Sequence, residues 1–237
     1  MSVEEVIARL ESIEAPLGRA DGVGCFTRLY LDVTRAVQTQ LAKAATFENP
    51  PFLARLDVVF AGLYLEAVDA HARDPHRVPR AWAPLFDMRG KPGIAPLQFA
   101  LAGMNAHINR DLPVALVACW RELGPSPTDQ RDFDRVNDVL ARVEGSVKEH
   151  YLGGTLRALD RLVHRVDRID DVVAMWDVRR ARDAAWVNAQ ALWALRDDKQ
   201  LSAEYLEVLD RSVGLAGRGL LQPADTWLQR LGRALKR

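Results

Sequence analysis

Several features that would direct a search for function are scarce in this sequence. It has only two cysteines, Cys25 and Cys119, each inside an apolar run and far from the other. Such spacing suits buried, reduced thiols rather than a disulfide framework or a metal finger. Basic and acidic residues number 32 each, so no net charge would attract nucleic acid or an anionic membrane, and we expect neither as a partner.

Long apolar runs are also missing. No uncharged stretch reaches the roughly 18 to 20 residues that a membrane span requires. The N-terminal segment, residues 1–20, is acidic and amphipathic and lacks the basic flank and apolar centre of a signal peptide. We therefore expect a cytoplasmic protein. Nucleotide-binding glycine patterns, the Gly-x-Ser-x-Gly nucleophile motif and paired Glu-x-x-His motifs are absent too, which excludes several common enzyme classes.

What the sequence does contain is helical periodicity. Apolar residues recur at intervals of three and four along most of the chain, whereas the alternation typical of strands is scarce. Ser2 with Glu5 forms a capping-box pattern that predicts the first helix, and residues 155–195 predict two long helices that meet near Asp170. The sequence thus predicts a single all-α domain over residues 1–237, a bundle of about nine helices.

One segment breaks this regularity. Residues 77–96 hold four prolines and two glycines, together with the large aromatic side chains of Trp82 and Phe86. A loop this irregular and this apolar is expected to pack against the rest of the protein. It would either cover the mouth of a pocket or tie two helices together.

A second unusual stretch is GMNAHINRDLP, residues 103–113, which places polar side chains inside an otherwise apolar helix. Pro113 predicts a kink or an interruption of that helix near Asn109. His107 and Asp111 are four residues apart and share one helix face. Gly103, one turn earlier, leaves space beside His107 for a ligand, a water molecule or a neighbouring backbone.

The other two polar residues of the block, Asn105 and Asn109, lie about 160° around the helix from that face. Each buried polar group costs about 1 to 3 kcal/mol if it is left without a partner. Asparagine and histidine also join helices or cap a break in purely structural networks. The block is therefore either a functional site or a structural hydrogen-bond network.

Two functional interpretations fit His107 and Asp111. In the first, His107 is a general acid or base that Asp111 orients, while Asn105 or Asn109 binds a substrate oxygen. In the second, His107 and Asp111 bind a divalent metal, because imidazole and carboxylate groups suit zinc, iron or manganese. The Gly-x-x-x-His-x-x-x-Asp pattern resembles one helix of the zinc-dependent phospholipase C and nuclease group, over these few residues only.

Two aromatic residues complete the predicted pocket. Tyr64 lies in the apolar stretch FAGLYLEA and needs a buried partner for its hydroxyl group, and Trp82 lies in the loop that would close one side. We expect both to line a site for a small-molecule substrate. Of the remaining histidines, His71 lies at a charged helix end, where a surface position is favoured over a role as metal ligand or base.

Four stretches together resemble a bacterial all-helical family, a domain of unknown function of about this length. They are FAGLYLEAVDA, the Trp82 to Phe86 loop, LQFALAGMNAHINRDL and RDAAWVNAQAL, within residues 47–195. The family's most recognisable feature is the block matched here by residues 103–112. The resemblance implies no established activity. It implies only that Asn105, His107 and Asp111 belong to the residues that define the family.

Overall fold

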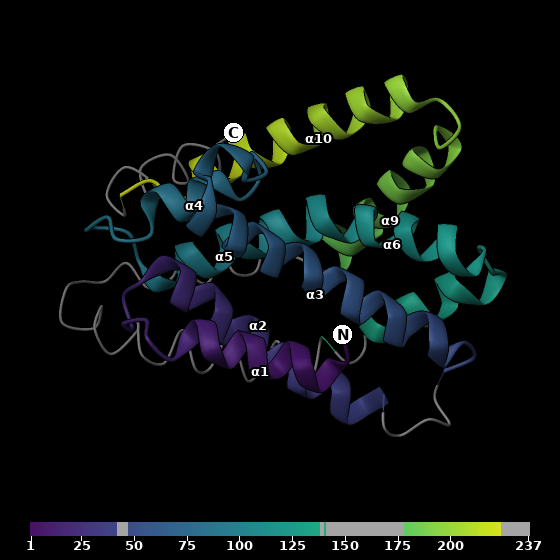
Figure 1. Ribbon diagram of the computed structural model, residues 1–237, viewed down its shortest axis with the longest axis horizontal. Helices are drawn as coiled ribbons and strands as arrows, with labels where there is room; N and C mark the ends of the chain where they lie inside the picture. Colours follow the sequence, from purple (N-terminus) through teal and green to yellow (C-terminus); the bar gives the residue numbers. More distant parts are fainter. Residues whose placement is uncertain (42–46, 138–139, 141–177, 224–237) are drawn as a thin grey trace, which may run out of the picture.

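Helices make up all the regular structure in the part of the chain that the structure describes. The computed structural model describes residues 1–41, 47–137, 140 and 178–223 (Figure 1). Eight α-helices have their bounds within these residues, and they pack into one bundle without any strand. They are α1 (Val3–Glu14), α2 (Gly22–Leu41), α3 (Pro50–Arg73), α4 (Ala83–Met88), α5 (Pro96–Ala106), α6 (Leu112–Leu123), α9 (Val178–Ala194) and α10 (Lys199–Leu220). The predicted all-α class is confirmed.

Two short elements and one further helical stretch complete the description. A 3-10 helix, η2 (Pro75–Arg77), follows α3, and a π-helical turn, η3 (His107–Asp111), joins α5 to α6. Residues 127–137 are helical as well. The predicted junction of two helices near Asp170 lies outside the described residues.

The helix ends follow from local side-chain chemistry. Ser2 and Glu5 form the predicted capping box at the start of α1, where each side chain binds the backbone N–H of the other residue. At the start of α3, the Asn49 side chain accepts the N–H of Phe52. Asp198 caps α10 in the same way. These caps satisfy N–H groups that have no acceptor within their own helix.

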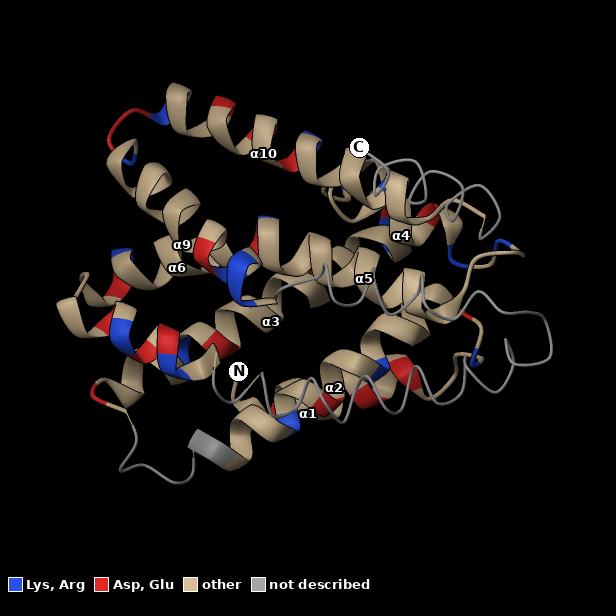
Figure 2. Ribbon diagram, turned by 180° about the vertical axis from the view of Figure 1, so that it is seen from behind, with Lys and Arg blue, Asp and Glu red and all other residues tan. Residues whose placement is uncertain are grey.

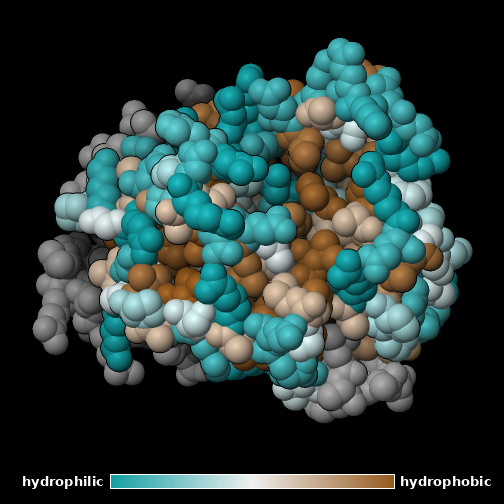
Figure 3. All heavy atoms as spheres, viewed as in Figure 1, coloured by the Kyte–Doolittle hydropathy of each residue, from teal (hydrophilic) through white to brown (hydrophobic). Residues whose placement is uncertain are grey.

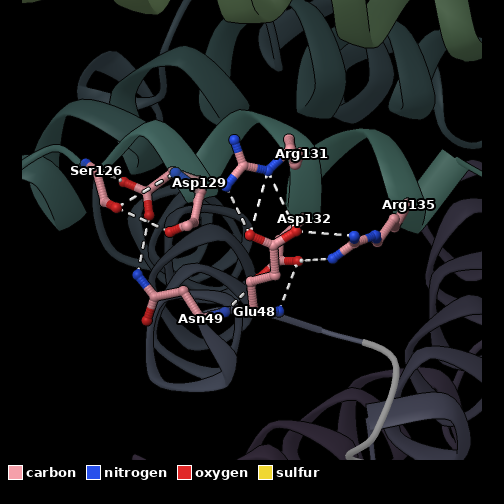
Figure 4. A network of polar contacts seen from close by, with 8 residues as sticks. Glu48, Asn49, Ser126, Asp129, Arg131, Asp132 and Arg135 are labelled. Atoms are coloured by element: carbon pink, nitrogen blue, oxygen red, sulfur yellow. Dashed lines mark hydrogen bonds and ion pairs between the residues drawn. The ribbon is translucent and has the colours of Figure 1, made fainter.

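A polar network fixes the start of α3 against the helix formed by residues 127–137 (Figure 4). The buried carboxylate of Asp132 accepts the backbone N–H groups of Glu48 and Asn49, while Asp129 accepts the Asn49 side-chain amide. Arg131 and Arg135 both pair with Glu48. Because every carboxylate of this network has N–H donors from the protein, the network holds two helices together.

The irregular segment 77–96 contains more structure than the sequence predicts. Where the prolines and glycines indicated a loop, residues 83–88 form α4, because Pro84 in the first helical turn has no N–H group that needs an acceptor there. The expected packing is confirmed, since Trp82 and Phe86 are buried. Asp210 of α10 fixes the approach to α4 by accepting the N–H groups of Arg80 and Ala81.

Pro113 interrupts the long central helix, as predicted, and does so through a π turn. A proline has no N–H to donate to the carbonyl four residues earlier, which here belongs to Asn109. The chain widens before it, and the N–H of Leu112 binds the carbonyl of His107, five residues back. Residues 107–111 therefore follow a wider path than the α-helices on either side.

The two larger hydrophobic cores of the described residues include residues on either side of this turn, Ala106 in the first and Leu112 in the second. The first gathers side chains from α1, α2, α4, α5 and the second half of α3, with Phe26, Tyr64 and Trp82 among the largest. The second joins the first half of α3 to α6, residues 127–137 and α9. Helix α3 contributes to both cores. Cys25 and Cys119 are both buried, as their apolar surroundings in the sequence predict.

The surface of the described residues mixes both charges. Both basic and acidic residues occur along α10 (Figure 2). Hydrophobic residues are visible between α10 and α3 on the face of Figure 3. Among the described residues, no helix is long and apolar enough to cross a membrane.

Candidate functional site

The carboxylate of Asp111 is the centre of a buried hydrogen-bond arrangement. Its Oδ2 atom accepts the indole N–H of Trp82 at 2.8 Å and lies 3.2 Å from Nδ1 of His107. Its Oδ1 atom accepts an N–H of Arg110 at 2.8 Å. Asp111 and His107 therefore form the pair that their spacing predicts.

These bonds determine the tautomer of His107. A carboxylate that accepts N–H groups at both oxygens has no proton to give, so Nδ1 of His107 is the donor to Asp111. Burial lowers the pKa of His107 below its usual value, although Asp111 acts in the opposite direction. A neutral imidazole with its proton on Nδ1 carries a lone pair on Nε2. That atom is buried and has no hydrogen-bond partner among the residues that the structure describes.

Aromatic rings hold the imidazole in place. The ring of Phe60 stacks on it with centroids 3.5 Å apart and an interplanar angle of 7°, and Tyr30 meets it edge-on at 4.5 Å. Phe26 lies on a further side at 5.9 Å. The orientation of His107 is thus set by its surroundings as well as by Asp111.

His107 also lines a cavity of about 160 Å³. The described part of its wall comes from α2, α3, α5, η3, α6, α9 and the helix of residues 127–137, and it is mostly apolar. The polar residues in this wall are Tyr30, Thr34, Asp57, His107 and Arg182. Such a combination, an apolar cavity with few polar groups, is typical of small-molecule sites.

The two asparagines of the block face another direction. The side-chain amide of Asn105 donates to the backbone carbonyl of Val213 in α10 at 2.9 Å, and Asn109 donates to Asn105 at 3.1 Å. Neither residue belongs to the described cavity wall. These contacts join the central helix to α10.

Tyr64 and Trp82 lie in the first core, with ring centroids 6.2 and 5.9 Å from that of His107. The Tyr64 hydroxyl group bonds with Thr27 at 2.6 Å, and the Trp82 ring is 4.9 Å from that of Tyr64. Both are fully buried in the first core and contribute nothing to the described cavity wall. The structure thus brings Trp82 to Asp111, and it is Asp111 rather than the cavity that Trp82 contacts.

The space that Gly103 was expected to leave for a ligand, a water molecule or a backbone is filled by a side chain. A Cβ atom at this position would lie 2.3 Å from two ring atoms of Phe26. Gly103 therefore permits the close approach of α2 to α5. The cavity lies elsewhere around His107.

Two residues of the cavity wall were missed by the sequence reasoning. Tyr30 and Asp57 each carry a buried oxygen atom without a hydrogen-bond partner. Burial raises the pKa of Asp57 to about 7. The sequence does contain a signal for Asp57. It lies on the same helix face as Leu53, Leu56 and Phe60, and a charged residue stands out among these apolar ones.

The family described as "Family of unknown function (DUF5995)" matches residues 3–223. The chain belongs to this family. This match covers more of the chain than the resemblance that the sequence shows within residues 47–195. No curated protein and no solved structure matches the chain.

A metal site in this DUF5995 protein would need several donor side chains gathered at one place. Among the described residues, no three His, Cys, Asp or Glu side chains gather where they could hold an ion. Both oxygens of Asp111 already accept N–H groups. The ring of His71 stacks on that of Phe86, with centroids 4.7 Å apart.

Proposed function

We propose that the protein is an enzyme that binds a small, largely apolar molecule in this cavity and uses His107 as a general base. The observation that carries the proposal is the state of His107 itself. It lines the cavity, its Nδ1 is held by Asp111, and its Nε2 is buried without a partner. A buried nitrogen lone pair without a donor is costly to the fold, so a use for it is expected.

The surrounding groups suit base catalysis. When Nε2 takes a proton from a bound molecule, the imidazole becomes positively charged, and the Asp111 carboxylate beside Nδ1 stabilises that charge. Trp82 and Arg110 hold the carboxylate in position through N–H bonds to its two oxygens. Neighbouring side chains cover Nε2. In this proposal those side chains move aside when the ligand binds.

A second function of another class has its own support. The contacts of Asn105 with Val213 and of Asn109 with Asn105 are those of a structural network. In this alternative the protein is a ligand-binding or scaffold protein, and the polar block serves to join helices. The two proposals differ at Nε2 of His107, which a network alone would leave without a partner.

The metal-dependent alternative has less support, because the Asp111 oxygens are already used by N–H donors. Elemental analysis of the purified protein beside the His107→Ala variant tests it. Near-stoichiometric zinc, iron or manganese that is lost in the variant would favour metal chemistry over the base that we propose.

The base can be tested without knowing the natural substrate. In 5-nitro-1,2-benzisoxazole, a base that removes the C3 proton forms a C≡N bond and breaks the N–O bond, and a coloured nitrophenolate is released. No nucleophile or metal is needed. We expect His107→Gln to lower the rate of this reaction about 100-fold.

The matched control is His71→Gln, which replaces a histidine that contacts Phe86 outside the cavity wall. It should leave the rate unchanged. In parallel, ¹⁵N NMR of labelled histidine should find the His107 proton on Nδ1. Equal rates for wild type and His107→Gln, or a proton on Nε2, would rule out the proposed base.

A further inference from the structure

The cavity wall carries two polar groups besides His107 that the proposed base does not use. The hydroxyl oxygen of Tyr30 and the Oδ2 atom of Asp57 are buried, and in the described part of the chain neither has a hydrogen-bond partner. Tyr30 comes from α2 and Asp57 from α3, whereas His107 belongs to the π turn. Three different elements thus each bring an unsatisfied polar atom to one apolar cavity.

Contacts place these three groups near one another. Asp57 lies one helical turn before Phe60, whose ring stacks on the imidazole of His107. Tyr30 meets both rings, with centroid distances of 6.2 Å to Phe60 and 4.5 Å to His107. Asp57 is also close enough to Tyr30 for its charge to raise the pKa of the Tyr30 hydroxyl, in addition to the larger effect of burial.

The proton on each group limits what it can bind. Nε2 of His107 can only accept a hydrogen bond, since its proton is on Nδ1. The Tyr30 hydroxyl keeps its proton because burial raises its pKa well above the usual value. The raised pKa of Asp57, about 7, leaves much of its carboxyl group protonated near neutral pH. The cavity therefore offers one acceptor and two donors.

Thr34 does not remove the need for a partner. Its hydroxyl lies close enough to that of Tyr30 to lower the pKa of the Tyr30 hydroxyl, against the larger effect of burial, but its own hydrogen bond goes to the backbone carbonyl of Tyr30 at 2.8 Å. The Tyr30 hydroxyl remains without a bond.

We propose that the cavity binds an uncharged, mostly apolar molecule that carries a hydroxyl group, such as a small phenol or alcohol. This rests on the proposed function of His107. The ligand hydroxyl donates a hydrogen bond to Nε2 of His107 and accepts hydrogen bonds from Tyr30 and Asp57. An ether or a ketone lacks the proton for Nε2, and a hydrocarbon satisfies none of the three groups.

An anionic ligand fits these surroundings less well. Arg182 is the cation of the described wall, but its Nε and NH2 atoms donate to Asn137 and to the carbonyl of Phe133. Its guanidinium group also lies 3.9 Å from the centre of the Phe133 ring. The size of the cavity, about 160 Å³, suits a molecule built on a single aromatic ring.

The test uses the full chain and four probes of similar size: phenol, anisole, toluene and benzoate. Dissociation constants are measured by NMR titration at neutral pH. Phenol should bind about 10-fold more tightly than toluene, the gain expected from two or three hydrogen bonds of ordinary net strength. Anisole should fall between them, and benzoate should bind most weakly.

Variants of Tyr30 and Asp57 test whether these two groups cause the preference for phenol over toluene. Tyr30→Phe and Asp57→Leu should each lower the ratio of phenol to toluene affinity about 3-fold, while toluene still binds and circular dichroism still reports a folded helical protein. The matched control is Tyr205→Phe, which removes a hydroxyl group that bonds with Asn188 outside the cavity wall. It should leave the ratio as in wild type.

The possible failures are distinguishable. If toluene binds as tightly as phenol, the cavity remains a ligand site and the hydroxyl preference is wrong. Tighter binding of benzoate would assign the cavity to anions near Arg182 and also overturn the inference. If none of the four probes binds, the cavity is not a ligand site, and the proposed function fails together with the inference.

Discussion

The indole N–H of Trp82 donates a hydrogen bond to Asp111 across 2.8 Å, although the two residues are 29 positions apart in the sequence. Asp111 in turn holds Nδ1 of His107. The apolar segment before α4 is thereby connected to the orientation of the imidazole. A change at Trp82 should therefore be measurable both in stability and at His107.

Trp82→Phe keeps an aromatic ring and removes the N–H donor. We expect the free energy of unfolding in urea to fall by about 1 to 3 kcal/mol, because a buried carboxylate loses a bond. Trp120→Phe is the matched control, since the indole N–H of Trp120 is buried without an acceptor. The smaller ring affects both variants, so an equal loss in the two would contradict a stabilising Trp82–Asp111 bond.

Asp111→Asn keeps the shape of the side chain and removes its charge. The imidazolium form of His107 then loses its stabilising partner, so the base reaction should slow at least about 10-fold. Melting temperature should also fall, because Arg110 loses a charged acceptor. The rate assay and a thermal melt check the two effects. An unchanged rate would mean that Asp111 serves the fold alone.

Asp57 should make stability depend on pH. Burial raises its pKa in the folded chain to about 7, from an ordinary value of 3.8. Between those values the folded state holds one proton more than the unfolded state, so the free energy of unfolding falls as pH rises from about 4 to 7. The total contribution is about 4 kcal/mol at most.

Asp57→Asn removes this proton while keeping a similar shape. The difference in free energy of unfolding between variant and wild type should therefore shift in favour of the variant by about 2 to 4 kcal/mol from pH 4 to pH 8. Urea titrations at both pH values measure it. The lowered pKa of His107 acts in both proteins and cancels in this difference. A constant difference would show that Asp57 titrates normally.

Gly103→Ala should destabilise the protein by about 1 to 3 kcal/mol, because the new methyl group would overlap the ring of Phe26. Gly62→Ala is the matched control within a helix. Its Cβ would have only the flexible end of Met1 at 3.8 Å, so the better helix propensity of alanine should stabilise α3 by about 0.5 to 1 kcal/mol. Thermal melts of both variants measure these changes in stability. An unchanged melting temperature for Gly103→Ala would contradict the close contact between Gly103 and Phe26.

Much of the fold was predictable because it depends on local patterns. Apolar spacing of three and four identifies helices, the capping box marks the start of α1, and the missing N–H of Pro113 predicts an interrupted helix. Helix α4 was missed because its prolines and glycines indicate a loop. Pro84 is compatible with a first helical turn, a detail that composition does not reveal.

The candidate site was predictable only in part. The spacing of His107 and Asp111 predicts their contact, but the directions of their neighbours depend on how helices pack. Asn105 and Asn109 bind each other and α10, and Tyr64 binds Thr27. Asp57 and Tyr30 join the cavity through the packing of α2 and α3 around η3, which no short segment encodes.

The π turn also has a consequence for insertions and deletions. Relative to an α-helical path, it contains one additional residue between α5 and α6, and each residue of a helix turns the chain by about 100°. Deleting one residue within 107–111 would remove this additional residue and rotate α6 by about 100° relative to α5. Helix α6 would then present another side to α9 and lose its packing in the second core. The packing of α6 therefore constrains the number of residues in this segment, and a change of length should destabilise the protein more than most substitutions there.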